Sequence, residues 1–363
     1  MRVVVKIGTS SLTDAGGRID TAAVARVATE VATARAAGHH VIVVSSGAIS
    51  AGLPPLGLEG RRPTDLPTLQ AVAAVGQHRL MATWDAALAG HGLVPGQVLL
   101  VPLDFINRQQ YLHARQTLER LLDLGVVPVV NENDAVADDE IRFGDNDRLA
   151  ALVAHLVRAD LLVLLTDTPG LLTGDPRRDE SASLIAEILE VDAELERLAT
   201  TGGSERGSGG MASKLAAAKM AAWSGVRAVI AAAGREGVLS DAVADVAGVG
   251  TVVRPHDRRL PARKLWIAFA LAPSGTVVVD DGARAALVQG GRSLLPAGVV
   301  SADGGFIAGD AVEVATTEGT VFAKGLVRHP AALVTRWAGC RTSELPADVE
   351  HEVIHRDDLV VLP

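Results

Sequence analysis

The sequence predicts an α/β protein in which a mostly parallel sheet is sandwiched by helices, followed by a small C-terminal all-β barrel. Up to about residue 253, short apolar runs alternate with longer stretches of helical spacing, a pattern typical of a parallel sheet covered on both faces. Residues 254–264 form a basic connector with two prolines, and short strands separated by Gly/Asp turns follow it. We therefore expect a first domain over residues 1–255, a linker over 256–273 and a second domain over 274–363.

The expected strands of the first domain are β-branched apolar runs that are too short for helices: Val3–Val5, Val41–Val44, Val98–Val101, Val126–Val130, Leu161–Leu165 and Val226–Ala231. The stretches between them that have helical spacing are Thr21–Ala37, Arg108–Leu124, Arg148–Arg158 and Met211–Ser224. The expected strands of the second domain are Gly275–Val279, Gly298–Val300, Asp310–Val314, Val321–Val327 and Asp358–Leu362. Ligands of parallel sheets bind at the loops after the carboxyl ends of strands, so those loops are the expected place of a site.

The composition is that of a globular protein, with 48% hydrophobic residues and a net charge of −9 over 363 residues. The one cysteine, Cys340, has no partner for an internal disulfide, and no apolar run reaches the ~20 residues that a membrane span needs. We therefore expect a cytoplasmic protein without membrane association, and the negative charge opposes binding to nucleic acid. An acidic protein that binds phosphates must use local lysines, backbone amides and a metal ion.

Residues 207–214 read Gly-Ser-Gly-Gly-Met-Ala-Ser-Lys and lead into an alanine-rich stretch that favours a helix. Glycines let backbone N–H groups point at a ligand, a helix N-terminus attracts anions, and Lys214 adds a full positive charge. Because Ser213 precedes Lys214, the segment is not a Walker A loop, which requires Gly-Lys-Ser/Thr. A flexible linker before a helix would have a similar composition, so the interpretation depends on other segments.

Two such segments follow buried strands near the N-terminus. Lys6 lies within an apolar run and is followed by Gly-Thr-Ser-Ser at 8–11. Burying an ammonium group is costly unless an anion pairs with it, although an exposed strand end would also explain Lys6. Residues 45–47, Ser-Ser-Gly, end the next strand and would suit a carboxylate or phosphate, or simply cap a helix.

Two further segments are rich in acidic and hydroxyl side chains. Asn-Glu-Asn-Asp-Ala-Val at 131–136 ends a buried strand, and Phe-Gly-Asp-Asn-Asp-Arg at 143–148 opens a helix. Capping needs one such side chain; the others could bind an ammonium group, organise lysines or hold a metal through water, unless they form a surface turn. Thr166 and Asp167 end another strand, before turns at 169–170 and 174–176. Lysines, glycine-rich turns and an acidic cluster on one sheet together predict phosphoryl transfer.

These strings resemble the amino acid kinase family, and within it the branch that phosphorylates L-glutamate in the proline pathway. The resembling strings are Val-Lys-Ile-Gly-Thr-Ser at 5–10, Ser-Ser-Gly-Ala-Ile at 45–49, Ala-Val-Gly-Gln at 74–77, Asn-Glu-Asn-Asp-Ala-Val at 131–136, Gly-Asp-Asn-Asp at 144–147, Leu-Thr-Asp at 165–167 and Gly-Gly-Met-x-x-Lys at 209–214. They run nearly end to end, and the trailing β segment, with the string Gly290–Gly298, is similar to the PUA domain that bacterial members of this branch often append. That pairing counts against kinases of acetylglutamate, aspartate or carbamate.

The resemblance implies transfer of phosphate from ATP to the side-chain carboxylate of glutamate, with Mg²⁺ held on the nucleotide and not by protein ligands. It implies that Lys6 and Lys214 flank the transferred phosphoryl group and that Asp147 holds both lysines. The implied glutamate-binding residues are Ser46, Asp134 and Asn146, with Asp134 beside the α-ammonium group. The implied ATP-binding residues are Lys6, Thr166, Asp167, Ser208, Gly209, Gly210, Met211, Ala212, Ser213 and Lys214.

Two positions depart from the family pattern. Ser208 stands where the family usually has threonine and keeps the hydroxyl, whereas Ala212 replaces a common hydroxyl residue and leaves only backbone contacts. The resemblance also implies feedback inhibition by proline and assembly into dimers or tetramers. A carboxylate acceptor is already ionised at neutral pH, so no catalytic histidine is expected among the ten in the chain.

An RNA-binding protein that acts through the PUA-like domain is the alternative from another functional class. Residues 275–363 carry seven Lys/Arg and twelve Asp/Glu, a net charge of −5. This sign is opposite to the usual footprint of a nucleic-acid-binding surface. Only the basic connector at 254–264 would support RNA binding, and ion pairs between domains would also explain it.

Overall fold

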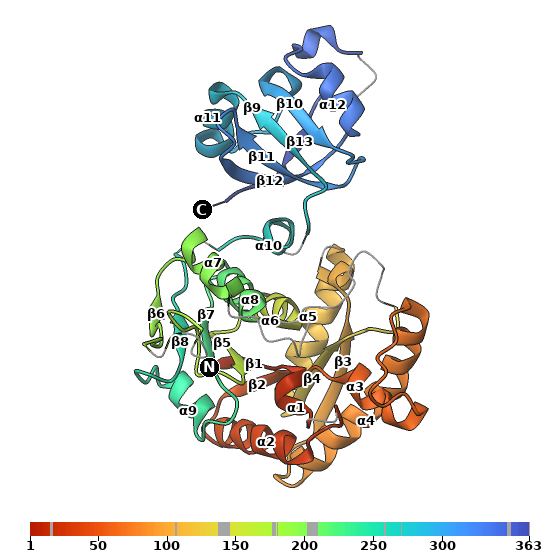
Figure 1. Cartoon of the computed structure of the whole chain (residues 1–363), viewed down its shortest axis with the longest axis vertical. Helices are drawn as coiled ribbons and strands as arrows, with labels where there is room; N and C mark the ends of the chain where they lie inside the picture. The colour runs from red at the N-terminus through yellow and green to blue at the C-terminus, as the bar shows by residue number, and fades with distance from the viewer. Residues whose placement is uncertain are drawn as a thin grey trace. The chain divides into compact units, whose positions relative to one another are not determined.

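The computed structural model divides into two compact units, Met1–Arg259 and Leu260–Pro363 (Figure 1). It describes the chain except residues 15–16, 106, 137–145, 176–178, 180, 202–209, 258, 270, 347–349 and 363. The statements below concern the described residues.

The first unit contains a sheet with the strand order β3-β4-β2-β1-β5-β7-β8-β6. Its strands are β1 (Arg2–Ile7), β2 (His40–Val44), β3 (Pro95–Leu100), β4 (Val127–Glu132), β5 (Leu161–Thr166), β6 (Glu187–Ile188), β7 (Arg227–Ala232) and β8 (Thr251–Val253). Neighbours from β3 to β7 are parallel, and β8 pairs antiparallel with β7. The carboxyl ends of β4, β2, β1 and β5 therefore follow one another along a single edge of the sheet.

The helices of the first unit are α1 (Thr9–Leu12), α2 (Thr21–Ala36), α3 (Ala48–Gly52), η1 (Pro54–Leu56), α4 (Leu66–Ala89), η2 (Pro102–Phe105), α5 (Arg108–Asp123), α6 (Asn146–Leu156), α7 (Ala193–Thr201), α8 (Met211–Trp223) and α9 (Val238–Val243). Figure 1 shows α2, α4 and α9 on one face of the sheet and α5, α6 and α8 on the other. Asp20, Asp65 and Asn107 start α2, α4 and α5 by accepting hydrogen bonds from first-turn N–H groups. Strands β1, β2, β4, β5 and β7 are buried on both faces, as their uninterrupted apolar runs predict, whereas the edge strand β3 is mostly half-buried.

The second unit contains a five-stranded sheet with the order β10-β9-β11-β12-β13. Its strands are β9 (Gly275–Val279), β10 (Val299–Gly304), β11 (Ala311–Thr316), β12 (Val321–Val327) and β13 (Ile354–Val361). The pairs are antiparallel except β9 with β11. This unit also has α10 (Ala262–Phe269), α11 (Asp281–Gly290), η4 (Pro296–Gly298), α12 (Ala331–Trp337) and η5 (Thr342–Glu344).

The parallel sheet sandwiched by helices and the separate C-terminal sheet confirm the predicted fold class. Helix α4 is absent from the prediction because its residues are small or apolar around most of its circumference, which weakens the amphipathic signal. Helix α10 lies inside the expected linker at 256–273. Its basic residues, Arg263 and Lys264, give this stretch the composition of an exposed connector.

Candidate functional site

Two buried lysines share one buried carboxylate at the carboxyl edge of the first sheet. Lys6 Nζ lies 2.6 Å from Asp147 Oδ1, and Lys214 Nζ lies 3.2 Å from Asp147 Oδ2. The exposed fractions are 4% for Lys6, 5% for Lys214 and 0% for Asp147. Ser213 Oγ donates a hydrogen bond of 2.7 Å to Asp147 Oδ2. Because two ammonium groups share one carboxylate, these three side chains together carry a net positive charge.

The carboxylate of Asp147 remains ionised in spite of its burial. Burial by itself would raise the pKa of Asp147, but the charges of Lys6 and Lys214 and the hydrogen bonds from Lys6 and Ser213 hold this pKa below its ordinary value. The ion pairs therefore persist at neutral pH. Asp147 fixes the positions of both ammonium groups from the first turn of α6, whereas the lysines come from β1 and the first turn of α8.

Beside this cluster, asparagine and serine side chains join the ends of β2, β4 and α6. Asn146 Nδ2 donates to Ser45 O at 2.9 Å, to Ser46 Oγ at 3.0 Å and to Asn131 Oδ1 at 2.9 Å. Ser45 is fixed from the far side, because the indole Nε1 of the fully buried Trp84 donates to Ser45 Oγ at 3.0 Å. Two of the predicted glutamate-binding residues, Ser46 and Asn146, are thus in direct contact.

Small residues allow this part of the site to form. A Cβ atom added at Gly52 would lie 2.0 Å from Val72 O, and one at Gly76 would lie 1.7 Å from Ala48 O. Helices α3 and α4 can therefore approach closely only with glycine at both positions. Gly47 has φ of 101°, which turns the chain sharply after Ser46. These contacts place the end of β2 against α4.

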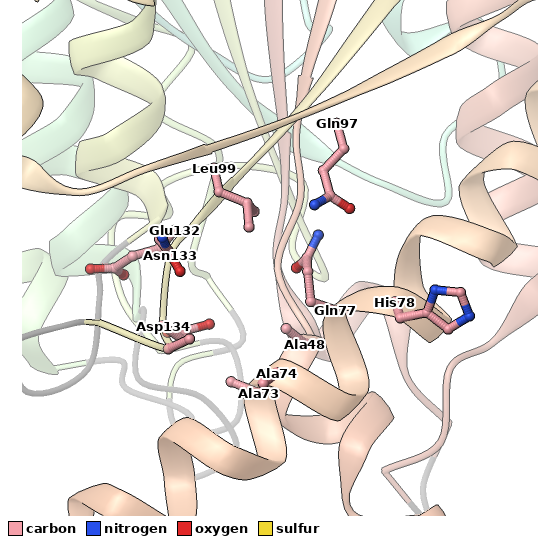
Figure 2. A pocket seen from close by; sticks show the side chains of 11 residues that line it. Ala48, Ala73, Ala74, Gln77, His78, Gln97, Leu99, Glu132, Asn133 and Asp134 are labelled. Atoms are coloured by element: carbon pink, nitrogen blue, oxygen red, sulfur yellow. The ribbon is translucent and has the colours of Figure 1, made fainter. Parts of the chain in front are cut away.

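Asp134 lines a cavity of about 340 Å³ next to these residues. Side chains of α4 and of β3 line the same cavity, and Figure 2 shows the amides of Gln77 and Gln97 pointing toward one another. Burial raises the pKa of Asp134 to about 6, against a smaller lowering effect of Arg62. A buried carboxylate with a raised pKa is one that a cationic ligand group would stabilise in its charged form.

The predicted nucleotide-binding residues lie on the other side of β1. Thr166 ends β5, which neighbours β1, and Thr166 Oγ1 donates to Asp167 Oδ1 at 3.1 Å. Gly210 is the N-cap of α8, and Met211 and Ala212 are half-buried in its first turn. The hydroxyl of Ser213 bonds to Asp147 and to Gly210 O. Ser208 and Gly209 lie outside the described residues.

The arrangement around Lys6 fits phosphate groups. A Cβ atom at Gly8 would lie 3.5 Å from Lys6 Nζ, so glycine keeps the space beside the ammonium group open. Gly210 has open space at its Cβ position and precedes the positive end of a helix of 13 residues. Within the described residues, no cluster of three or more His, Cys, Asp or Glu could hold a metal ion.

The sequence predicts no individual role for Gln77 and Trp84, and it singles out Asn131 and Ser45 only as members of longer polar strings. Their signals exist but are indirect: Gln77 is the last residue of the Ala-Val-Gly-Gln string, and Asn131 opens the Asn-Glu-Asn-Asp string. Asn131 Nδ2 donates to Gln77 Oε1 at 2.8 Å across 54 residues of sequence. Contacts of this kind become visible only when the fold is known.

Comparison with known proteins covers both units. The model of the amino acid kinase family matches residues 1–232, and that of the PUA domain matches residues 275–345. The glutamate 5-kinase of Myxococcus xanthus is 49% identical over 99% of this chain and 96% of its own length. That of Streptomyces coelicolor is 47% identical with the same coverage, and that of Pelobacter propionicus is 44% identical over 99% of this chain and 97% of its own.

Among solved structures, the carbamate kinase from Giardia lamblia bound to AMP-PNP aligns with 70% of this chain and 98% of its own. The TM-score is 0.50 and the sequence identity is 19%, a level at which the likeness supports the fold alone. No helix among the described residues has the length and apolar character needed to cross a membrane.

Proposed function

This chain belongs to the amino acid kinase family and to its glutamate 5-kinases, and from this premise we propose how its residues phosphorylate L-glutamate with ATP. An oxygen of the side-chain carboxylate attacks the γ-phosphorus of ATP, the bond from this phosphorus to the β,γ-bridging oxygen breaks, and ADP leaves. The products are ADP and L-glutamyl 5-phosphate, the first intermediate of proline biosynthesis. The attacking carboxylate needs no protein base, because it is ionised at neutral pH.

The observation that carries this proposal is the buried pair of lysines on Asp147. Phosphoryl transfer needs positive charge that is already in position where negative charge develops, and a site shielded from water strengthens that charge. Lys6 and Lys214 supply it from opposite oxygens of Asp147, at 2.6 and 3.2 Å. Asp147 acts as a positioning residue, because it orients both cations before the substrates bind.

The order of strands along the sheet edge supports an in-line arrangement of the two substrates. Asp134 and Asn146 lie near the ends of β4 and β2, where we propose that they bind the α-ammonium group of glutamate with Ser46. Thr166, Asp167 and the start of α8 lie beyond β1, where we propose that they bind ATP. Lys6, on the strand between the two groups, then lies at the point of transfer.

We propose that Mg²⁺ accompanies ATP and neutralises the phosphate oxygens when bound. The donors of the described site support this, because the carboxylate of Asp147 already pairs with two lysines. Lysines and backbone N–H groups would bind the remaining phosphate oxygens.

Glutamate-dependent formation of ADP tests the substrate. With Mg²⁺ and ATP, we expect ADP formation with L-glutamate and none above background with N-acetylglutamate, L-aspartate or carbamate. Activity with one of these and not with glutamate would contradict the proposed substrate while keeping the reaction type.

Three further proposals rest on the family resemblance and composition. We propose that proline inhibits the enzyme, that the chain forms dimers or tetramers, and that it acts in the cytoplasm, as its single cysteine favours. Inhibition is measured as the loss of ADP formation with added proline, and assembly by sedimentation. Full activity at high proline or a monomer at micromolar concentration would contradict the first two proposals.

A further inference from the structure

Gln77, which lines the same cavity as Asp134, begins a series of three hydrogen-bonded amide side chains that ends at Asn146, a proposed glutamate-binding residue. Asn131 Nδ2 donates to Gln77 Oε1 at 2.8 Å, and Asn146 Nδ2 donates to Asn131 Oδ1 at 2.9 Å. The preceding residue, Gly76, permits the close contact of α4 with Ala48. In the Ala-Val-Gly-Gln string, Gly76 thus allows α4 to approach Ala48, and the next residue, Gln77, bonds to Asn131 of β4.

Two backbone groups fix the direction of every hydrogen bond that links Gln77, Asn131 and Asn146. The N–H of Glu132 donates to Asn131 Oδ1 at 2.9 Å, and a backbone N–H can only donate. Asn131 must therefore turn Nδ2 toward Gln77, and Gln77 must accept this hydrogen bond with Oε1. At the other end, the carbonyl oxygen of Ser45 can only accept, so Asn146 must turn Nδ2 toward it. The amide orientations consequently follow from the backbone.

This polarity leaves one acceptor available at Asn146. The two hydrogens of Asn146 Nδ2 are shared among three acceptors, namely Ser45 O, Ser46 Oγ and Asn131 Oδ1. Asn146 Oδ1 is buried and has no hydrogen-bond partner among the described residues. A buried acceptor of this kind suits an ammonium group, which has three donors and no acceptor.

We propose that Gln77 is a positioning residue for the amino acid substrate, an inference that rests on the proposed function. Its Oε1 holds Asn131 in the orientation in which Asn131 Oδ1 anchors Asn146, and Asn146 Oδ1 then accepts from the α-ammonium group of glutamate. Without an acceptor at position 77, Asn131 Nδ2 loses its partner in a buried environment. The Asn131 side chain then rotates to find another acceptor for Nδ2, and Asn146 loses its hydrogen bond to Asn131 Oδ1.

The two polar atoms of the Gln77 side chain have different surroundings. Gln77 Oε1 bonds to Asn131, whereas Gln77 Nε2 is buried without a partner among the described residues. Gln77→Met keeps the length and removes both polar atoms. Gln77→Glu keeps an acceptor toward Asn131 and removes the donor.

Steady-state kinetics of the full chain provide the test. We expect Gln77→Met to raise KM for glutamate by about tenfold, which corresponds to one buried hydrogen bond with its unpaired donor. KM for ATP should change much less, because the nucleotide residues lie beyond β1. Gln77→Glu should restore most of the lost glutamate affinity. Gln116→Met, on an exposed part of α5, is the matched control and should leave both constants unchanged.

A double-mutant cycle tests the route through Asn131. Asn131→Asp keeps the acceptor for Asn146 but loses the donor to Gln77, so adding Gln77→Met to it should cost clearly less than in the wild-type background. Equal costs in both backgrounds would contradict the route, and an unchanged KM in Gln77→Met would contradict the role of Gln77.

If Gln77→Glu were as impaired as Gln77→Met, the relevant atom would not be Oε1 and the proposal would fail. A parallel loss in kcat, in KM for ATP and in melting temperature would indicate a purely structural role and would also overturn it. These outcomes differ from failure of the proposed function, in which the wild-type chain itself would form no ADP with glutamate.

Discussion

At the scale of single residues, the site depends on charges that are buried and yet paired. Lys6, Lys214 and Asp147 would each be costly to bury alone, and together they form a preorganised cationic centre. We expect removal of one member to change catalysis more than binding, because the need for positive charge is greatest as the phosphoryl group moves.

Lys214→Ala is expected to lower kcat by roughly 10²–10³-fold, the usual cost of losing one group that stabilises the transition state. KM for glutamate should change far less. Lys219→Ala is the matched control on the same helix, since Lys219 makes a peripheral ion pair of 2.8 Å with Glu196. An unchanged kcat with only a raised KM for ATP would assign Lys214 to binding of the ground state.

Asp134 is expected to make glutamate binding dependent on pH. Its pKa is raised to about 6 by burial, and only the ionised carboxylate attracts an ammonium group. KM for glutamate should therefore rise as pH falls through about 6, and Asp134→Asn should have a high KM at every pH. A wild-type KM that is flat between pH 5 and 8 would contradict this placement of the amino acid.

The raised pKa of Asp134 has the opposite pH dependence in its effect on the free energy of unfolding of the unliganded protein. A carboxyl group whose pKa is higher in the folded than in the unfolded state favours folding at low pH, and this contribution is lost as pH rises through about 6. Asp134→Asn should therefore be more stable than wild type at pH 8, with a smaller difference at pH 5. Melting temperatures at the two pH values, without substrates, check the prediction.

At the scale of elements, the contact between α3 and α4 sets the position of the loop that carries Ser46. Gly76→Ala would place Cβ 1.7 Å from Ala48 O, so α4 must shift. We expect a loss of about 1–3 kcal/mol in the free energy of unfolding, typical of overpacking, and a raised KM for glutamate.

Gly90→Ala, at the C-cap of the same helix, is the control for this prediction. Its φ is −58° and the nearest atom to an added Cβ would be 3.4 Å away. Chemical denaturation should show little change for Gly90→Ala. Equal stability of the two variants would mean that the helices can separate at no cost.

The elements that the sequence predicts well are those whose burial is uniform. Observed β1, β2, β4, β5 and β7 differ from their expected runs by at most two residues at either end, because strands covered on both faces read as unbroken apolar runs. Helix α4 and the helices of the second unit escape prediction, because their spacing lacks a clear polar face or their composition resembles a connector.

The site is predictable only in part for a related reason. Lys6 draws attention because a charge within an apolar run requires a partner, and Asp147 because it belongs to an acidic string that exceeds what capping needs. The bond of Ser213 to Asp147 and that of Asn131 to Gln77 do not follow from the sequence, since neutral side chains are common anywhere and these partners lie 66 and 54 residues apart. Which neutral groups meet depends on the close approach of helices.

At the scale of the whole molecule, the negative net charge opposes binding of nucleic acid. The chain carries a net charge of −9, and residues 275–363 carry seven basic against twelve acidic side chains. We expect the full chain to show no salt-sensitive binding of structured RNA, as measured by fluorescence anisotropy. Sub-micromolar binding that weakens steeply with salt would contradict this expectation and give the second unit a different role.

The most direct test of phosphorylation on the glutamate side chain is trapping of the product with hydroxylamine. An acyl phosphate reacts with hydroxylamine to give a hydroxamate and releases phosphate. With wild-type chain, ATP, Mg²⁺ and L-glutamate, we expect glutamyl hydroxamate in proportion to ADP, and none with Lys214→Ala on the same time scale. Glutamate-dependent formation of ADP from ATP without any hydroxamate would contradict transfer to the carboxylate.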